Sequence, residues 1–445
     1  MTIKNGDCKH IALFGTFNEN KYFLGDYKDS FDLVGFNANI IAHAPAGIAA
    51  FISQLKNKLY FIDPQTHAFQ QPLKTIMRKT DGKWELKKSI TRLVDYYGSI
   101  IKKYAGKTPI TAGDISDEAI GEICKNVLEF QLDIVQESAE NLDVKEFLDF
   151  SQIELRPEFL IAPYFYLELD KVENELRDNL KFITESKKIM NMEGLFSQKP
   201  LFAEIVIEKE ILVDPGSIRK VIEEYSKCPA DGFLIWIDDF SEVSVSETIL
   251  KRYKEFLSKL GENRKPIIAM HGSYFSIALA GEKGLLAGVG HGIEYGEHRP
   301  VIPVGGGVPL AKFYFPKFHK RVNYNPDAQD ILLERDWIKS RGVYIREVCS
   351  CNMCKEVIKN DVQNDFSKYG ETKESKKNGQ LYPTPEAMDK SRRHYLNTKI
   401  NEYKKCASSP IAEIINELKT SQSIAEKIKS HPFTHLIKWV NVLSD

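Results

Sequence analysis

The stretch Leu201–Asp238 contains LFAEIVI at 201–207, IRKVIEEYS at 218–226 and FLIWID at 233–238. The first and last pieces are near-continuous apolar runs, which are typical of parallel strands buried on both faces. The middle piece has apolar residues at helical spacing and follows Pro215, a residue that favours a helix start. A strand, a helix and a strand in this order predict a βαβ unit with parallel strands.

Similar apolar runs recur along the first 290 residues and predict six more strands. They are His10–Gly15, Asn39–His43, Leu59–Asp63, Phe159–Phe165, Ile267–His271 and Leu285–Gly290. Eight strands with helical patterns between many of them, such as Ser246–Leu260, predict an α/β protein with a (β/α)8 TIM-like barrel. A doubly wound open sheet has the same alternation of elements and stays open as the alternative.

Composition and charge exclude several classes of protein. The formal net charge is −1, and no run of about 18 apolar residues predicts a membrane span. The first residues lack a basic region followed by a long apolar run, so we expect a cytoplasmic protein. The segment Lys312–Lys405 is locally basic, with 20 Lys and Arg against 13 Asp and Glu. Such a surplus suits contact with phosphates, and it equally suits a solvated helical surface.

Three of the seven cysteines lie within six positions, in Cys349-Ser-Cys351-Asn-Met-Cys354. Thiolates this close can converge on one tetrahedral Zn²⁺ and fit a reducing compartment better than a disulfide framework does. A fourth ligand closes a structural site; His394 is the first candidate and Cys406 the reserve. With four protein ligands no position is open, so we expect a structural zinc.

The domain boundaries follow from these patterns. The gap between Asp63 and Phe159 is too long for one crossover, and Trp84–Tyr104 and Ser116–Ser138 look helical. We therefore expect the barrel at residues 1–340 with a helical insertion at about 75–150. A zinc-binding subdomain and the C-terminal helices are expected at 341–445.

The order of Cys349, Cys351, Cys354 and His394 resembles the zinc knuckle of tRNA-guanine transglycosylases. In that family the C-x-C-x-x-C motif follows the eighth barrel strand, and a histidine at the head of a later helix completes the site. The gap between cysteines and histidine is longer here. The resemblance implies a (β/α)8 barrel, a structural zinc and exchange of a guanine base in nucleic acid.

Carboxylates at strand ends are the candidate catalytic residues, because barrel enzymes place their chemistry there. Asp63 ends one strand and is followed by Phe69-Gln70; the family has a general acid/base aspartate followed closely by Phe-Gln, and the resemblance gives Asp63 that role. The spacing is longer here, and the family's paired glycines are absent. Capping of a turn is the other interpretation of Asp63. Asp238 and Asp239 end another strand on opposite sides, so either can be a catalytic carboxylate.

The family's nucleophilic aspartate, just after the eighth strand, has no counterpart here. Residues 288–297 read GVGHGIEYGE, so the nucleophile is Asp238 or Asp239, or Glu294 serves, or covalent chemistry is lost. The residues around Trp236 and the patch 291–299 resemble more the DpdA-like branch, whose members insert a 7-deazaguanine into DNA. This resemblance favours DNA as the substrate.

Polar residues near the predicted strand ends are candidates for substrate binding. They are Glu204, His271, His291, Glu294 and Arg299. Glycine-rich turns with locally paired charges are the alternative, as is a buried ion pair for Glu204. Further on, Gly305–Gly307 precedes the run KFYFPKFHKR (312–321), whose basic and aromatic side chains suit a nucleic-acid strand.

The expected chemistry is base exchange through a covalent glycosyl-enzyme intermediate. One carboxylate attacks the sugar C1′ as guanine leaves, and a second moves the proton. The target base must leave the stack. The expected partners are DNA, a free 7-deazaguanine base such as preQ0, accessory strand-opening proteins and, by resemblance, a second copy of the chain. The alternatives are the same chemistry on tRNA, or a non-catalytic, zinc-containing subunit that binds nucleic acid.

Overall fold

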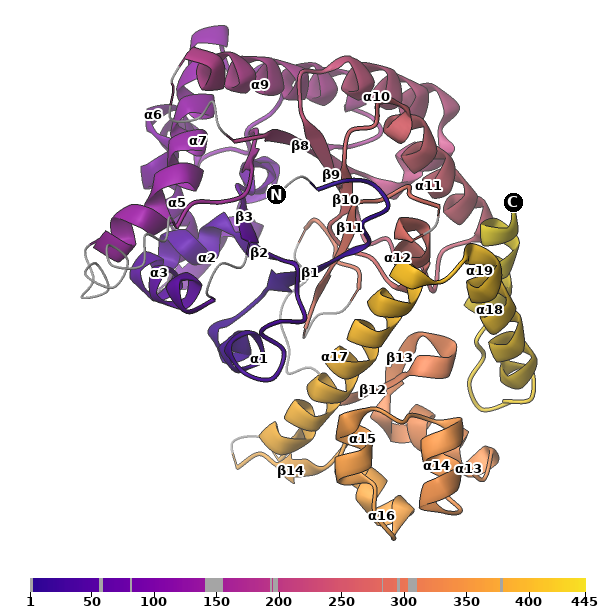
Figure 1. Ribbon diagram of the computed structural model, residues 1–445. Coiled ribbons are helices and arrows are strands. Elements are labelled where there is room, and N and C mark those ends of the chain that lie inside the picture. The colour runs from indigo at the N-terminus through magenta and orange to yellow at the C-terminus, as the bar shows by residue number, and fades with distance from the viewer. Residues whose placement is uncertain are drawn as a thin grey trace. The chain divides into compact units, whose positions relative to one another are not determined.

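The computed structural model describes residues 3–55, 59–80, 82–140, 155–192, 194, 199–281, 283–293, 297–302, 310–376 and 379–445 (Figure 1). Contacts between residues divide the chain into two compact units. The first comprises Met1–Phe240, Arg252–Gly272 and Gly284–Pro303, and the second Ser241–Lys251, Ser273–Lys283 and Val304–Asp445. The boundary expected after residue 340 does not coincide with this division.

The first unit is built on a nearly closed barrel of eight parallel strand positions, as predicted. Along the sheet the strands follow the order β3-β2-β1-β11-β10-β9-β8-β6, and β7 pairs with β8 beyond β6. The bounds are β1 (Lys9–Phe14), β2 (Leu33–Asn37), β3 (Leu59–Asp63), β6 (Leu160–Ile161), β7 (Tyr166–Leu167), β8 (Leu201–Ile207), β9 (Gly232–Ile237), β10 (Ile267–Ala269) and β11 (Gly288–Gly292). The Glu158 N–H donates to the Tyr60 carbonyl at 2.8 Å and links the two ends of this path.

Helices surround these strands (Figure 1). They are α1 (Asn20–Leu24), α2 (Ala38–His43), α3 (Pro45–Gln54), α4 (Leu73–Ile76), α5 (Lys88–Tyr97), α6 (Ser99–Tyr104), α7 (Asp117–Glu140), α9 (Val172–Met192) and α10 (Pro215–Lys227). In the outer layer α3 contacts α7, α7 contacts α9, and α9 contacts α10. The start of α10 shows how sequence sets a boundary: the Asp214 side chain accepts the Ser217 N–H at 2.8 Å, and Pro215 occupies the first turn.

Two predicted elements were wrong. Asn39–His43 forms helix α2, and the second strand is Leu33–Asn37. Gly35 breaks the apolar pattern of that strand for a packing reason, since a Cβ there would lie 2.6 Å from the Phe61 ring. The segment predicted to be helical from Trp84 begins instead as a strand. A hairpin of β4 (Met77–Thr80) and β5 (Lys83–Leu86) opens the insertion, and helices follow it from Lys88.

The barrel interior is a packed apolar core. It contains Ile11, Leu33, Phe61, Phe159, Ile161, Tyr164, Tyr166, Phe202, Val206, Leu234, Trp236, Ile268, Met270, Ala287 and Val301. The glycines of β11 belong to this packing, because a Cβ on Gly290 would lie 2.6 Å from the Met270 carbonyl oxygen. Close strand contact explains this glycine.

The second unit contains α12 (Tyr274–Ala280) and most of the C-terminal chain. The further elements are β12 (Lys312–Phe315), β13 (Lys320–Asn323), α13 (Gln329–Glu334), α14 (Arg341–Glu347), α15 (Asn352–Val357), α16 (Val362–Ser367), β14 (Thr372–Glu374), β15 (Leu381–Pro383), α17 (Pro385–Ser408), α18 (Ile411–Ala425) and α19 (His435–Ser444). Helix α11 (Glu247–Leu260) contributes residues to both units. Buried Glu242 accepts the N–H groups of Ser273 and Ser276, and its carbonyl accepts the Trp439 indole N–H at 3.0 Å. These bonds join three separate stretches of the chain.

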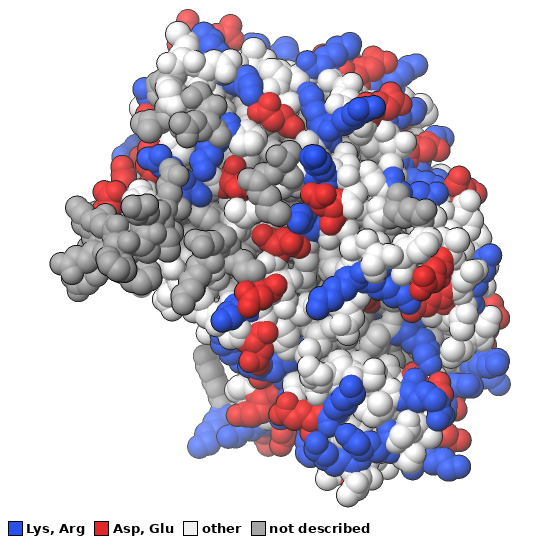
Figure 2. All heavy atoms as spheres, in the orientation of Figure 1, with Lys and Arg blue, Asp and Glu red and all other residues white. Residues whose placement is uncertain are grey.

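The surface carries both signs of charge. Basic and acidic side chains are interspersed over the face shown in Figure 2. Among the described helices, none is long and apolar enough to cross a membrane.

Candidate active site and metal centre

Three carboxyl groups lie on the inner face of the barrel, two at the C-terminal ends of their strands and one in the middle of its strand. Asp63 is the last residue of β3, Glu204 lies in β8, and Asp238 directly follows β9. On each strand the residue two positions earlier belongs to the barrel core. Side chains alternate along a strand, so all three carboxyl groups share the core-facing side. In TIM barrels this end carries the active site.

Asp63 and Glu204 form a buried carboxyl pair, with 2% and 1% of their surface exposed. The Tyr164 hydroxyl and the Gln65 N–H both donate to Oδ1 of Asp63, at 2.7 and 2.9 Å. Neither oxygen of Glu204 has an N–H or O–H donor in hydrogen-bond range among the described residues, and its carboxyl interacts with that of Asp63. Carboxylate oxygens only accept, so a hydrogen bond within the pair requires a proton on one member. The two groups therefore titrate together.

The surroundings raise the pKa of both members of the pair. Burial raises the pKa of Asp63 to about 6, against the opposing effects of its hydrogen bonds and of the Arg299 charge. Burial, followed by the negative charge of Asp63, raises the pKa of Glu204 well above its ordinary value. Because the upward shift of the pKa is larger for Glu204 than for Asp63, the shared proton is favoured on Glu204.

A hydrogen-bonded chain continues from Asp63 to a histidine that the sequence analysis did not single out. The Tyr164 hydroxyl has one proton, which it donates to Asp63, so it accepts from His67 Nδ1 at 3.0 Å. This fixes the proton of His67 on Nδ1 and leaves Nε2 as an acceptor. Burial, helped by the charge of Arg299, lowers the pKa of His67 to about 3, so the ring is neutral at physiological pH.

Trp236 brings together two of the predicted substrate-binding residues. His271 meets the indole edge-on, with ring centroids 5.1 Å apart, and the Arg299 guanidinium lies 5.5 Å from the indole centroid. The Trp236 N–H donates to the Arg299 carbonyl at 3.0 Å. Burial, with the nearby Arg299 charge, lowers the pKa of His271 well below its ordinary value. The cluster thus combines one cation, two neutral imidazoles and the carboxyl pair.

The adjacent aspartates after β9 have separate environments, as alternation predicted. Asp238 accepts the Tyr166 hydroxyl at 3.1 Å and the Val301 N–H at 2.7 Å. Asp239 has a left-handed backbone (φ 44°), and its side chain is 56% exposed and 3.8 Å from His298. Asp238 is therefore held inside the barrel mouth, and Asp239 faces solvent. The sequence analysis paired Asp63 with one of these two residues, whereas the structure places Asp63 against Glu204.

Among the described residues, one predicted substrate-binding residue lies away from this cluster. His291 pairs with Ala12 in the sheet register and lies fully buried on the outer face of β11. Its Nε2 is 2.8 Å from Nε2 of His10, so the prediction that it binds substrate is not supported by its position. Glu294 and the Gly305–Gly307 run lie outside the described residues.

The predicted nucleic-acid run 312–321 has its aromatic side chains inside the second unit. Phe313, Tyr314, Phe315 and Phe318 are each at most 1% exposed. They are not available to stack on bases, whereas contact of the basic residues of the run with phosphates stays a prediction. Tyr164, Tyr166 and His67 were missed, although the tyrosines lie on alternate positions just after an apolar run and His67 follows a strand-end aspartate.

The metal-ligating residues come together as predicted. The ligand atoms of Cys349, Cys351, Cys354 and His394 all lie within 4.8 Å of one another, and all four residues are buried. The Cys351 N–H points to the sulfur of Cys349, and the Cys354 N–H to that of Cys351, each at 3.4 Å. Four ligands about 2.3 Å from a zinc ion would have such spacings, so the donor set fits a tetrahedral site. Cys406, the reserve ligand, is not part of the group.

The orientation of His394 is fixed by its other neighbours. Its Nδ1 lies 3.4 Å from the sulfurs of Cys351 and Cys354, and its Nε2 donates to the Tyr314 carbonyl at 2.7 Å. Phe313 stacks on the ring with centroids 4.3 Å apart. A hydrogen bond on the distal nitrogen is the usual outer-shell support of a metal-bound histidine.

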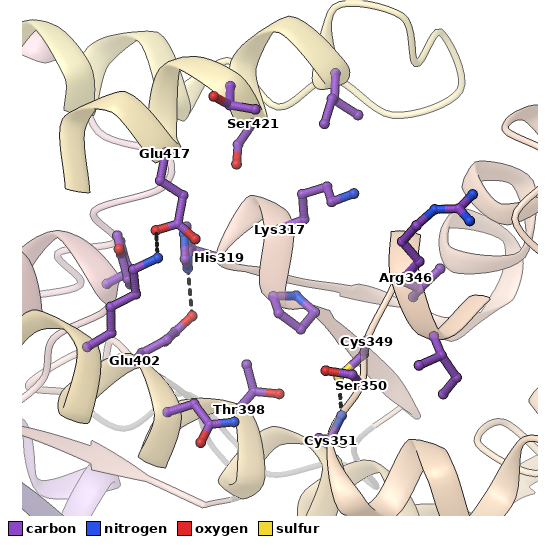
Figure 3. Close-up of a pocket in the computed structure, with 18 residues that line it drawn as sticks. Lys317, His319, Arg346, Cys349, Ser350, Cys351, Thr398, Glu402, Glu417 and Ser421 are labelled. Carbon is purple, nitrogen blue, oxygen red and sulfur yellow. Dashed lines mark hydrogen bonds and ion pairs between the residues drawn. The ribbon is translucent and has the colours of Figure 1, made fainter. Parts of the chain in front are cut away.

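A polar cavity of about 410 Å³ lies in the second unit beside the metal ligands (Figure 3). His319 Nδ1 is 2.6 Å from the Glu402 carboxylate, which also pairs with buried Lys399 at 2.8 Å. Cys349 and Cys351 line the same cavity. Small molecules that fit this cavity can therefore reach Cys349 and Cys351.

No family model matches the chain, and no match was found among curated proteins.

Proposed function

We propose that the protein is a transglycosylase that exchanges guanine in nucleic acid, with DNA favoured, for a free 7-deazaguanine base such as preQ0. The observation that carries the proposal is the buried Asp63–Glu204 pair at the C-terminal end of a parallel barrel. The proposed reaction needs one ionised and one protonated carboxyl group in contact. Such a pair can give a proton to a leaving base and recover it from an incoming one. The metal-ligating cluster, which resembles the family's knuckle, supports the same assignment, and zinc is the ion its donors favour.

The roles follow from geometry. Retaining enzymes hold the nucleophile and the acid on opposite sides of the scissile bond, about 5 Å apart. Asp63 and Glu204 are in contact, so both act on the side of the base. Asp238, fixed by Tyr166 and the Val301 N–H, is the candidate nucleophile toward the sugar.

The reaction then balances as follows. An Asp238 oxygen bonds to C1′, the bond from C1′ to the guanine nitrogen breaks with its electrons going to the base, and the proton of Glu204 neutralises the leaving purine. In the second half, the incoming base loses its ring N–H proton to the carboxyl pair as its nitrogen bonds to C1′ and releases Asp238. Arg299 adds a cation near the pair, and its guanidinium lies over the aromatic ring of Trp236.

The test is incorporation of radiolabelled guanine and preQ0 into duplex DNA and into tRNA. The wild type should label DNA, and Asp238→Asn should label neither polymer. Asp239→Asn is the matched control, since that side chain is solvent-exposed, and it should retain activity. Labelling of tRNA alone would show that the protein exchanges bases in tRNA and not in DNA. Absence of exchange into both polymers would contradict the proposal and favour a non-catalytic binding subunit.

The pH dependence gives a second prediction. Exchange needs ionised Asp63, whose pKa is about 6, so kcat/KM should rise with pH and level off above that value. Tyr164→Phe removes a hydrogen bond that lowers this pKa, so the inflection should move to higher pH. Tyr166→Phe, whose hydroxyl contacts Asp238 instead, should leave the inflection in place. Equal pH profiles for the two tyrosine variants would argue against Asp63 as the titrating group.

A further inference from the structure

The β4–β5 hairpin carries an unusual concentration of positive charge. Residues 74–88 hold six basic residues against two acidic ones, in a chain whose formal net charge is −1. The basic residues are Lys74, Arg78, Lys79, Lys83, Lys87 and Lys88, and each is exposed. Arg78, Lys79 and Lys83 form no ion pair with a described residue. Their charge is therefore available to an anionic partner.

The same hairpin exposes the chain's most accessible tryptophan. Trp84 is 58% exposed, whereas Trp236, Trp337 and Trp439 are at most 4% exposed. In the antiparallel register Trp84 lies opposite Lys79, so both side chains project from one face of the ribbon. A large aromatic left in water beside unpaired cations is a feature of contact surfaces.

Topology places the hairpin at the same end of the barrel as the carboxyl pair. It follows β3, the strand that ends at Asp63, with only the short segment Pro64–Ile76 between them. That segment is tied to the cluster, because the Gln70 side chain accepts the Tyr166 N–H at 2.7 Å. The base of the hairpin is closed by the Lys87 N–H on the Ile76 carbonyl at 2.9 Å.

We propose that the β4–β5 hairpin is a DNA-binding element that enters a groove of the duplex, with its cations on phosphates and Trp84 against the base edges. A two-stranded ribbon fits the major groove of B-DNA, which is about 12 Å wide. The major groove of A-form RNA is too deep and narrow for side chains to read, so the shape of the element favours DNA. This inference rests on the proposed function only in taking nucleic acid as the polymer.

The burial of the other three tryptophans gives a direct measurement. Acrylamide quenching of the full-length protein should show one accessible tryptophan population, which Trp84→Phe removes. Addition of a mixed-sequence DNA duplex should protect that population from the quencher. Trp84→Ala should weaken duplex binding about tenfold, because the apolar contact of the indole with the base edges is lost.

Charge reversal tests the phosphate contacts. Lys79→Glu with Lys83→Glu should weaken binding and reduce the slope of log affinity against log salt by about 2, because two phosphate contacts are lost. The control is Lys227→Glu with Lys259→Glu. These exposed lysines end the helices that lead into β9 and β10, at the opposite end of the strands. The control pair should retain the wild-type slope.

Each alternative outcome overturns the inference. Unchanged affinity and quenching in the hairpin variants would show that DNA binds elsewhere, and equal or stronger protection of Trp84 by an RNA duplex would exclude the preference for DNA. These assays measure binding alone. A protein that binds DNA through Trp84 but exchanges no base would contradict the proposed function and leave the hairpin assignment intact.

Discussion

Replacing Glu204 by Gln is expected to lower the rate of base exchange by a factor of about 10² to 10⁴, the usual contribution of a general acid. The amide has the shape of a neutral carboxylic acid, but it cannot release a proton to the leaving base. Asp63→Asn should cause a loss of similar size. The measurement is single-turnover incorporation of labelled guanine at saturating DNA.

The stability of these variants separates a catalytic from a structural role. Both carboxyl pKa values are raised in the folded protein, so the folded state binds protons more tightly than the unfolded chain does. For Asp63 this contribution to stability is complete below its unfolded pKa of about 4 and is lost as pH rises through about 6. At pH 7 the fold bears the cost of burying ionised carboxylate, and a neutral amide does not bear it. Neither variant should therefore unfold more readily than the wild type at pH 7.

The double variant completes the experiment. If Asp63 and Glu204 share one proton-handling task, Glu204→Gln combined with Asp63→Asn should be about as slow as the worse single variant. If the loss of exchange rate in the double variant equals the product of the two single losses, the two residues act independently. Full activity in either single variant, with normal folding, would exclude the pair from the chemistry.

The sequence predicted the parts of the fold that depend on local pattern. Runs such as Leu201–Ile207 are apolar enough to mark a buried strand in isolation, and the knuckle at 349–354 contains three of its four ligands within six positions. The strand Leu33–Asn37 was missed because its glycine resembles a breaker. The reason for that glycine, close contact with Phe61, lies on another strand.

The site depended on contacts that no local pattern encodes. Glu204 was predicted to bind a base or form an ion pair, and only closure of the ring brings it to Asp63. Tyr164 lies 101 positions from the aspartate that it holds. Likewise, the aromatic side chains of the run at 312–321 are interior. The β4–β5 hairpin, which was expected to be helical, exposes its aromatic residue instead.

Loss of the metal should be the largest stability effect in the protein. Cys351→Ala is expected to abolish binding of one zinc ion per chain and to destabilise the second unit by several kcal/mol, since structural zinc sites contribute folding free energy. The ligands join three parts of that unit: the knuckle, helix α17 and, through the Tyr314 carbonyl, strand β12. Metal analysis and thermal unfolding measure the two effects.

The matched control is Cys406→Ala, which removes a buried cysteine from the helix that carries His394 but lies outside the ligand group. It should keep its zinc, so any loss of stability would reflect packing alone. Chelators should reproduce the Cys351→Ala result in the wild type, because the neighbouring cavity exposes Cys349 and Cys351 to small molecules. An ion held by four protein ligands would have no position for water, so we expect it to act through the fold. Normal zinc content in Cys351→Ala would contradict the assignment of this ligand.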